Sequence, residues 1–228
     1  METVKLIPPS RGFATAEFEN RTNRLQALMA AQDIGALFVT TEPEFRYFSG
    51  FKSQFWESPT RPWFLVIPAN GKPIAVVPEI GVVGFEQTWI EDVRSWPSPR
   101  PEDDGISLLT DTLKIAAGSR QKIGIMMGPE THLRMPAANF RQLCENLNNH
   151  EIVDISPLLR SIRAVKSAAE IAKIRFACEV TAAGFDFLRN TIQPGITERE
   201  ACKAMQIEML RLGADSCPYL IAASGPGG

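Results

Sequence analysis

Residues 163–200 read RAVKSAAEIAKIRFACEVTAAGFDFLRNTIQPGITERE, and they carry the clearest local signals in the chain. Within them, SAAE (167–170) is a capping box, because Ser167 can accept a hydrogen bond from the amide three residues on while Glu170 reaches back. TERE (197–200) repeats the device, and Pro194-Gly195 between them ends a helix. The stretch therefore predicts two helices, one beginning after Ser167 and the other after Thr197.

Both predicted helices carry an apolar stripe with alternating spacings of three and four residues. The stripe of the first comprises Ile171, Ile174, Cys178, Thr181, Phe185 and Leu188, and that of the second comprises Ala201, Met205, Met209 and Leu212. Gly213 is a natural stop. Such a pair needs a sheet to cover it, yet only PYLIAAS (218–224) follows as an expected strand, and one strand cannot complete a core. We therefore expect the isolated chain to expose a large apolar face, to be poorly stable and to associate.

Upstream, strand and helix patterns alternate, which favours an α/β layer. Asn70-Gly71 is a strong hairpin signal, since both residues accept a positive φ. Strands are expected at 35–40, 63–68, 73–78, 89–96, 122–127 and 151–155, helices at 17–33, 106–117, 131–148 and 156–163, and a short helix or turn at 42–50. The boundary of this region is expected near Arg163–Lys166.

Composition excludes several classes of protein. The 228 residues carry a net charge of −2 with Lys and Arg spread along the chain, so no nucleic-acid surface is expected. No apolar run approaches the ~18–20 residues of a membrane span, and the first residues do not form a signal peptide. Cys144, Cys178, Cys202 and Cys217 are widely spaced, which indicates reduced thiols and a cytoplasmic protein.

Catalytic residues are hard to find. The two histidines, His132 and His150, are not spaced with a second ligand as in a metal site. Glu102, Asp103 and Asp104 form a short acidic run that can bind a cation but is more often simply solvated. The terminal SGPGG lacks the Lys and Ser/Thr of a phosphate-binding loop. We therefore predict no catalytic and no metal-binding residue in this chain.

One loop, QFWESPTRPWF (54–64), does carry candidates for substrate binding, namely Trp56 and Arg61. A guanidinium beside an exposed aromatic ring can bind a carboxylate or a cationic substrate by bidentate hydrogen bonding and stacking. Two alternatives remain open: Trp56 can pack on the sheet, and Arg61 can cap a turn.

Several stretches resemble the creatinase–prolidase–aminopeptidase P family. RLQALMAAQDIGALFVTTEPEFRYFSGF (24–51) is similar to the opening of its N-terminal domain. The start of its pita-bread catalytic domain is similar to IRAVKSAAEIAKIRFACEVTAAGFDFL (162–188), IQPGITEREACKAMQIEMLRLGAD (192–215) and LIAASGPGG (220–228). Two stretches depart from the pattern: Phe45 stands where the family often has Asn, and residues 54–64 look like members that act on small non-peptide substrates.

The resemblance implies a fold class: an α/β creatinase-type N-terminal domain with a mixed sheet, then the first helices and strand of an incomplete α+β pita-bread domain. It divides the chain into an N-terminal arm (1–16), an N-terminal domain (17–163) and the truncated start of the catalytic domain (164–228). In the family a substrate-binding His follows the Ser-Gly strand. Two Asp, one His and two Glu come after it and hold two divalent metals, here Mn, Zn or Co, none of them bound by this chain.

The resemblance also implies a homodimer in which the loop bearing Trp56 and Arg61 reaches the active site of its mate. The expected function is the N-terminal portion of a metal-dependent Xaa-Pro aminopeptidase or dipeptidase, inactive as this chain alone. One alternative is a creatinase-like hydrolase or lyase acting on a small charged molecule. Another is a non-catalytic pita-bread module that binds a peptide or partner. The sequence leaves the substrate, the metal and the natural end of the chain open.

Overall fold

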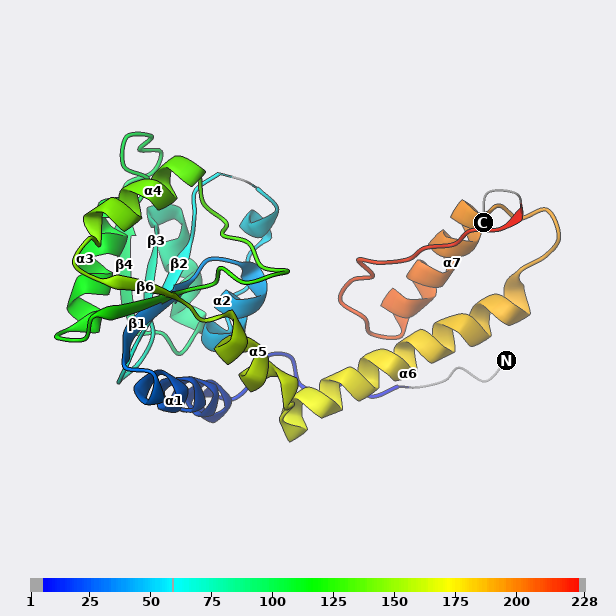
Figure 1. Ribbon diagram of the computed structural model, residues 1–228. Helices are drawn as coiled ribbons and strands as arrows, with labels where there is room; N and C mark the ends of the chain where they lie inside the picture. Colours follow the sequence, from blue (N-terminus) through cyan, green and yellow to red (C-terminus); the bar gives the residue numbers. More distant parts are fainter. Residues whose placement is uncertain (1–5, 59, 226–228) are drawn as a thin grey trace. The chain divides into compact units, whose positions relative to one another are not determined.

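A computed structural model describes residues 6–58 and 60–225 of the chain. The described residues divide into two compact units (Figure 1). One comprises Gly12–Val165. The other comprises the described part of the N-terminal arm up to Arg11 together with the residues from Lys166 onward.

The unit Gly12–Val165 is built on a six-stranded mixed sheet with the order β4-β3-β2-β1-β5-β6. Its strands are β1 (Ile34–Val39), β2 (Phe64–Pro68), β3 (Ile74–Pro78), β4 (Asp92–Trp96), β5 (Lys122–Ile125) and β6 (Glu151–Asp154). β2 runs antiparallel to both β1 and β3, whereas β3–β4, β1–β5 and β5–β6 are parallel pairs. The predicted α/β class with a mixed sheet is confirmed.

Helices cover both faces of this sheet (Figure 1). They are α1 (Thr15–Ala31), α2 (Glu42–Ser49), α3 (Ile106–Ala117), α4 (Ala137–Asn146) and α5 (Ser156–Ala164), with two 3₁₀ segments, η1 (Gln54–Glu57) and η2 (Glu79–Gln87). β1 alternates between the faces, as the two-residue period of a strand requires. Leu37 packs with residues of α1, α2 and α5, whereas Phe38 packs with residues of α3 and α4.

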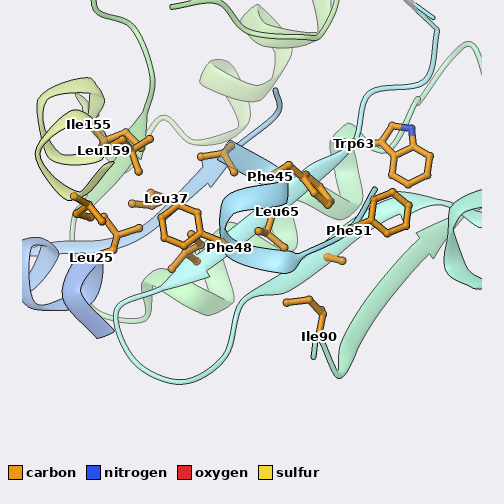
Figure 2. Packing of buried hydrophobic residues seen from close by; sticks show 14 of the residues in the cluster. Leu25, Leu37, Phe45, Phe48, Phe51, Trp63, Leu65, Ile90, Ile155 and Leu159 are labelled. Carbon is orange, nitrogen blue, oxygen red and sulfur yellow. The ribbon is translucent and has the colours of Figure 1, made fainter. Parts of the chain in front are cut away.

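The first face holds the larger aromatic cluster (Figure 2). Phe45 and Phe48 of α2 are fully buried there, with Leu25 of α1 and Leu159 of α5. Phe51, which follows α2, stacks on Phe85 at 4.3 Å between ring centroids. The predicted short helix at 42–50 is thus present, and its apolar side chains lie in the core.

The hairpin predicted from Asn70-Gly71 is confirmed, since β2 and β3 pair in the register Phe64↔Val76 and Gly71 has a φ of 87°. One helix differs from prediction. The helix expected over 131–148 is restricted to Ala137–Asn146, because Pro136 stands directly before it and the residue preceding a proline disfavours the helical conformation.

A carboxylate joins the ends of the parallel strands β5 and β6. Asp154 Oδ1 accepts hydrogen bonds from the Met127 amide (3.0 Å) and from the Ser156 amide and hydroxyl (2.9 and 2.6 Å). Desolvation would raise the pKa of the Asp154 carboxyl, but the hydrogen bonds from Ser156, Met127 and Gly128 outweigh it, and the net pKa is lowered. The ionised carboxylate therefore stabilises this edge of the sheet.

The second unit contains α6 (Ala168–Thr191) and α7 (Glu198–Arg211). Both predicted capping boxes are confirmed, with Ser167 and Glu170 on α6 and Thr197 and Glu200 on α7 bonded reciprocally. The helices pack through Gly184, where an added Cβ would lie 3.0 Å from Met209 Cγ. The absent side chain lets the two helices approach closely.

One feature of this unit differs from the sequence prediction, and a second adds detail to it. Residues 218–224, expected as a strand, form no strand, because no segment among the described residues pairs with them. The predicted apolar stripe of α6 lies largely in solvent: Ile171 is 46% exposed, Ile174 50% and Phe185 61%. Of all the described helices, none has the length and apolar character of a membrane span.

Candidate substrate-contact loop

The loop that carries Trp56 and Arg61 connects α2 to β2 and includes η1. Ser53 caps η1 by accepting a hydrogen bond from the Phe55 amide at 3.1 Å. The Ser58 and Thr60 hydroxyls lie 2.8 Å apart and share a hydrogen bond. These contacts are all local, which is typical of a loop that depends on other elements for its placement.

Trp56 lies against the aromatic cluster of the core and is half-buried. Its ring centroid is 5.1 Å from that of Phe45 and 5.8 Å from that of Trp63. The indole Nε1 atom is buried and has no hydrogen-bond partner among the described residues. The indole ring of Trp56 therefore packs against aromatic side chains of α2 and of the segment before β2.

Arg61 is partly exposed and has a φ of 58°, in the left-handed region that arginine seldom adopts. Among the described residues, its guanidinium has no hydrogen-bond or ion-pair partner. The backbone carbonyl, by contrast, accepts a hydrogen bond from Arg134 Nη1 at 3.2 Å.

Arg134 organises the loop, and the sequence analysis did not identify it. Its Nη2 donates to the carbonyls of Phe55 (3.0 Å) and Ser58, and more weakly to that of Thr60 at 3.4 Å. Burial lowers the pKa of the Arg134 guanidinium, although an arginine stays charged. No motif surrounds Arg134 in the sequence, because the contacts it makes are to backbone atoms some seventy residues earlier.

The other candidates have structural explanations. Asp103 Oδ1 accepts from the Ser107 amide (3.0 Å) in the first turn of α3, and Asp104 Oδ1 accepts from the Trp96 indole (3.3 Å). The four cysteines are free thiols. Within residues 6–58 and 60–225, no group of three His, Cys, Asp or Glu side chains could hold a metal ion. These described residues do not fit a two-metal centre.

Comparison with known proteins assigns the unit that contains the sheet to a family. The family model of the creatinase/prolidase N-terminal domain matches residues 21–165. The chain belongs to this family. The match begins within α1 and extends through α5, and it includes all six strands and the loop with Trp56 and Arg61.

Curated relatives extend across most of the chain. The agropine synthesis cyclase of Rhizobium rhizogenes is 28% identical over 192 residues, covering 79% of this chain and 45% of the relative. An uncharacterized peptidase of Staphylococcus saprophyticus is 25% identical over 191 residues, covering 84% of this chain and 50% of the relative. The chain spans about half the length of these relatives.

Solved structures show the same fold. The prolidase from Thermococcus sibiricus superposes with a TM-score of 0.75 at 20% identity, over 90% of this chain and 53% of the other. The dipeptidase PepE from Mycobacterium ulcerans gives a TM-score of 0.70 at 23% identity, over 90% and 52% respectively. The predicted resemblance to the creatinase, prolidase and aminopeptidase P family is therefore confirmed.

Proposed function

We propose that this chain is the N-terminal portion of a metal-dependent hydrolase of the Xaa-Pro aminopeptidase or dipeptidase type. The observation that carries the proposal is the family match over 21–165, together with the similarity to a dipeptidase and a prolidase structure over 90% of this chain. The ligands for two divalent metals, Mn, Zn or Co, would lie in polypeptide following Gly228, and this chain alone would be inactive. The enzyme would be a cytoplasmic homodimer.

Within that enzyme, Arg61 is the proposed substrate contact and Trp56 a secondary one. The guanidinium of Arg61 is not engaged by any described side chain, so it can form a bidentate pair with a substrate carboxylate. A dipeptide that ends in proline presents such a carboxylate. Trp56 is partly buried against the aromatic cluster, so only the exposed part of its side chain can contribute.

A second candidate keeps the fold and changes the substrate. The relative with 28% identity is named as a cyclase rather than as a peptidase. A small charged non-peptide substrate would use the same Arg61 guanidinium through its carboxylate. A non-catalytic binding module is the third possibility, and it predicts no turnover of either class.

The test uses the complete polypeptide encoded by the natural gene, with Mn²⁺, Zn²⁺ or Co²⁺ supplied in turn. Xaa-Pro dipeptides and longer Xaa-Pro peptides form one substrate panel, and small guanidino and amino carboxylates form the other. Release of the residue before proline supports the peptidase, and turnover of the second panel alone supports the non-peptide enzyme. If neither panel is turned over with any metal, the enzymatic proposal fails.

The Arg61→Ala variant then tests the substrate contact. Losing a hydrogen-bonded charge pair costs ~1.5–3 kcal/mol, so KM should rise by roughly 10- to 100-fold at ~1.4 kcal/mol per decade. Lys52→Ala is the matched control, because Lys52 is an exposed cation of the same loop and makes no hydrogen bond or ion pair with any described residue. A KM for Arg61→Ala equal to that of the control removes Arg61 from the substrate site.

A further inference from the structure

We infer that Arg134 is a positioning residue that holds the described residues of segment 54–61 (54–58, 60 and 61) in one conformation and so fixes the backbone from which the Arg61 side chain projects. The consequence for substrate binding rests on the proposed function, whereas the effect on the loop does not. Arg134 lies between β5 and α4, more than seventy residues beyond the loop in sequence.

The contacts form a clamp on the loop backbone. Both terminal nitrogens of the guanidinium donate to carbonyls: Nη2 to those of Phe55 and Ser58, and Nη1 to that of Arg61 at 3.2 Å. The guanidinium carbon lies 5.4 Å from the Trp56 ring centroid. One planar, rigid fork thus binds both ends of the segment and touches the indole between them.

Arg134 is itself fixed to the sheet. Its backbone amide donates to Thr40 Oγ1 at 2.9 Å, and Thr40, directly after β1, is only 2% exposed. Every other hydrogen bond of segment 54–61 that joins described residues is local, between Ser53 and Thr60. The clamp is therefore the hydrogen-bonded link that joins this loop to the sheet in the described part of the chain.

Charge explains why an arginine occupies this position. Burial lowers the pKa of Arg134, and no described carboxylate pairs with it, so its hydrogen bonds to described residues go to backbone carbonyls. A lysine ammonium is a compact point charge that cannot bridge carbonyls at both ends of the segment. Arg61, with its φ of 58°, lies at the end of this clamp, where an unfavourable backbone angle has to be held by its surroundings.

Hydrogen exchange on the chain tests the clamp directly. The Ser58 amide donates to the Phe55 carbonyl, which Arg134 also binds, so this amide reports on the loop. In Arg134→Ala and Arg134→Lys, exchange across 55–61 should accelerate at least about tenfold, while the β1 and β2 amides stay protected. Arg141→Ala should leave exchange unchanged, because Arg141 is an exposed arginine of α4 that makes no hydrogen bond or ion pair with a described residue.

Three results overturn the inference. Loop exchange in Arg134→Ala can match that of wild type, the lysine variant can restore wild-type exchange, or the sheet amides can lose protection together with the loop. The last result would make Arg134 a general stability residue, because a clamp predicts a local change.

A double-mutant cycle in the complete gene product links the clamp to substrate. Arg61→Ala and Arg134→Ala should each raise KM with little change in kcat, and the combined variant should show no more than the larger single effect. Multiplying effects would overturn the link between the two arginines. Faster loop exchange in Arg134→Ala with unaltered kinetics in Arg61→Ala would refute the proposed substrate contact and leave the clamp intact.

Discussion

Replacing Phe45 by alanine should destabilise the unit Gly12–Val165 by about 4 kcal/mol. The ring is fully buried, and its centroid lies 5.1–6.0 Å from those of Phe51, Trp56 and Phe85. Transfer of the side chain to water accounts for ~1.5–3 kcal/mol. The cavity and the lost aromatic edge contacts add the remainder, since rings on three sides cannot all collapse into the space.

Tryptophan fluorescence during urea unfolding measures this change for the sheet unit alone. All four tryptophans of the chain, namely Trp56, Trp63, Trp89 and Trp96, lie within Gly12–Val165, so α6 and α7 contribute no signal. With an m-value near 2 kcal/mol/M, the midpoint should fall by about 2 M urea.

Phe55→Ala serves as the control for that measurement. Phe55 is 39% exposed and lies outside the packed centre of the cluster, so its loss should cost no more than about 1 kcal/mol. Equal midpoints for the two variants, or a shift below ~0.5 M urea for Phe45→Ala with an unchanged m-value, would refute the assignment of this ring to the core.

Three further predictions concern other parts of the chain. Gly124→Ala should lower the free energy of unfolding in urea by at least ~1–3 kcal/mol, because the new Cβ would lie 2.3 Å from Ile155 Cγ2. In Gly71→Ala the new Cβ meets no atom within 4 Å, and only the positive φ of residue 71 is strained. The lowered pKa of Asp154 stabilises the folded protein above the ordinary carboxyl pKa of ~3.9, and this stability is lost as pH falls through the folded-state pKa. Asp154→Asn should therefore weaken the fall of Tm with decreasing pH. An unchanged dependence of Tm on acid pH contradicts this. Phe185→Asp should reduce concentration-dependent light scattering of the chain, since that ring is 61% exposed on α6; a wild-type chain that is already monomeric would refute the expectation.

The features that the sequence predicts well are those in which the interacting residues are close in the chain. Both capping boxes depend on side chains three residues from their partner amides, and both are present at Ser167 and Thr197. The hairpin at Gly71 depends on a turn whose backbone angles glycine allows. In each case the residues that determine the conformation lie within one short window.

The loop that carries Trp56 and Arg61 has a placement that no short sequence window predicts. The sequence correctly places Trp56 and Arg61 in a loop outside the predicted strands. It leaves open whether the Trp56 ring and the Arg61 guanidinium face the core or solvent. Packing of Trp56 on Phe45 depends on how α2 lies on the sheet. Binding of the loop by Arg134 depends on how the segment after β5 returns past the end of β1. Neither relation has a periodic signature, because contacts to backbone carbonyls impose no pattern on the residues that supply them.

Residues 218–224 show a different reason for failure. Their composition favours a strand, and Tyr219 and Ile221 have the side chains that strands prefer. A strand is nevertheless stabilised by pairing, and the described residues offer no partner, so both side chains remain more than 80% exposed. The same physical cause leaves the α6 stripe in solvent, because a helix face and a strand edge are both completed by a sheet. An apolar pattern therefore predicts which secondary structure a segment can form. Whether the segment forms it and buries its apolar face depends on the elements that pack against it.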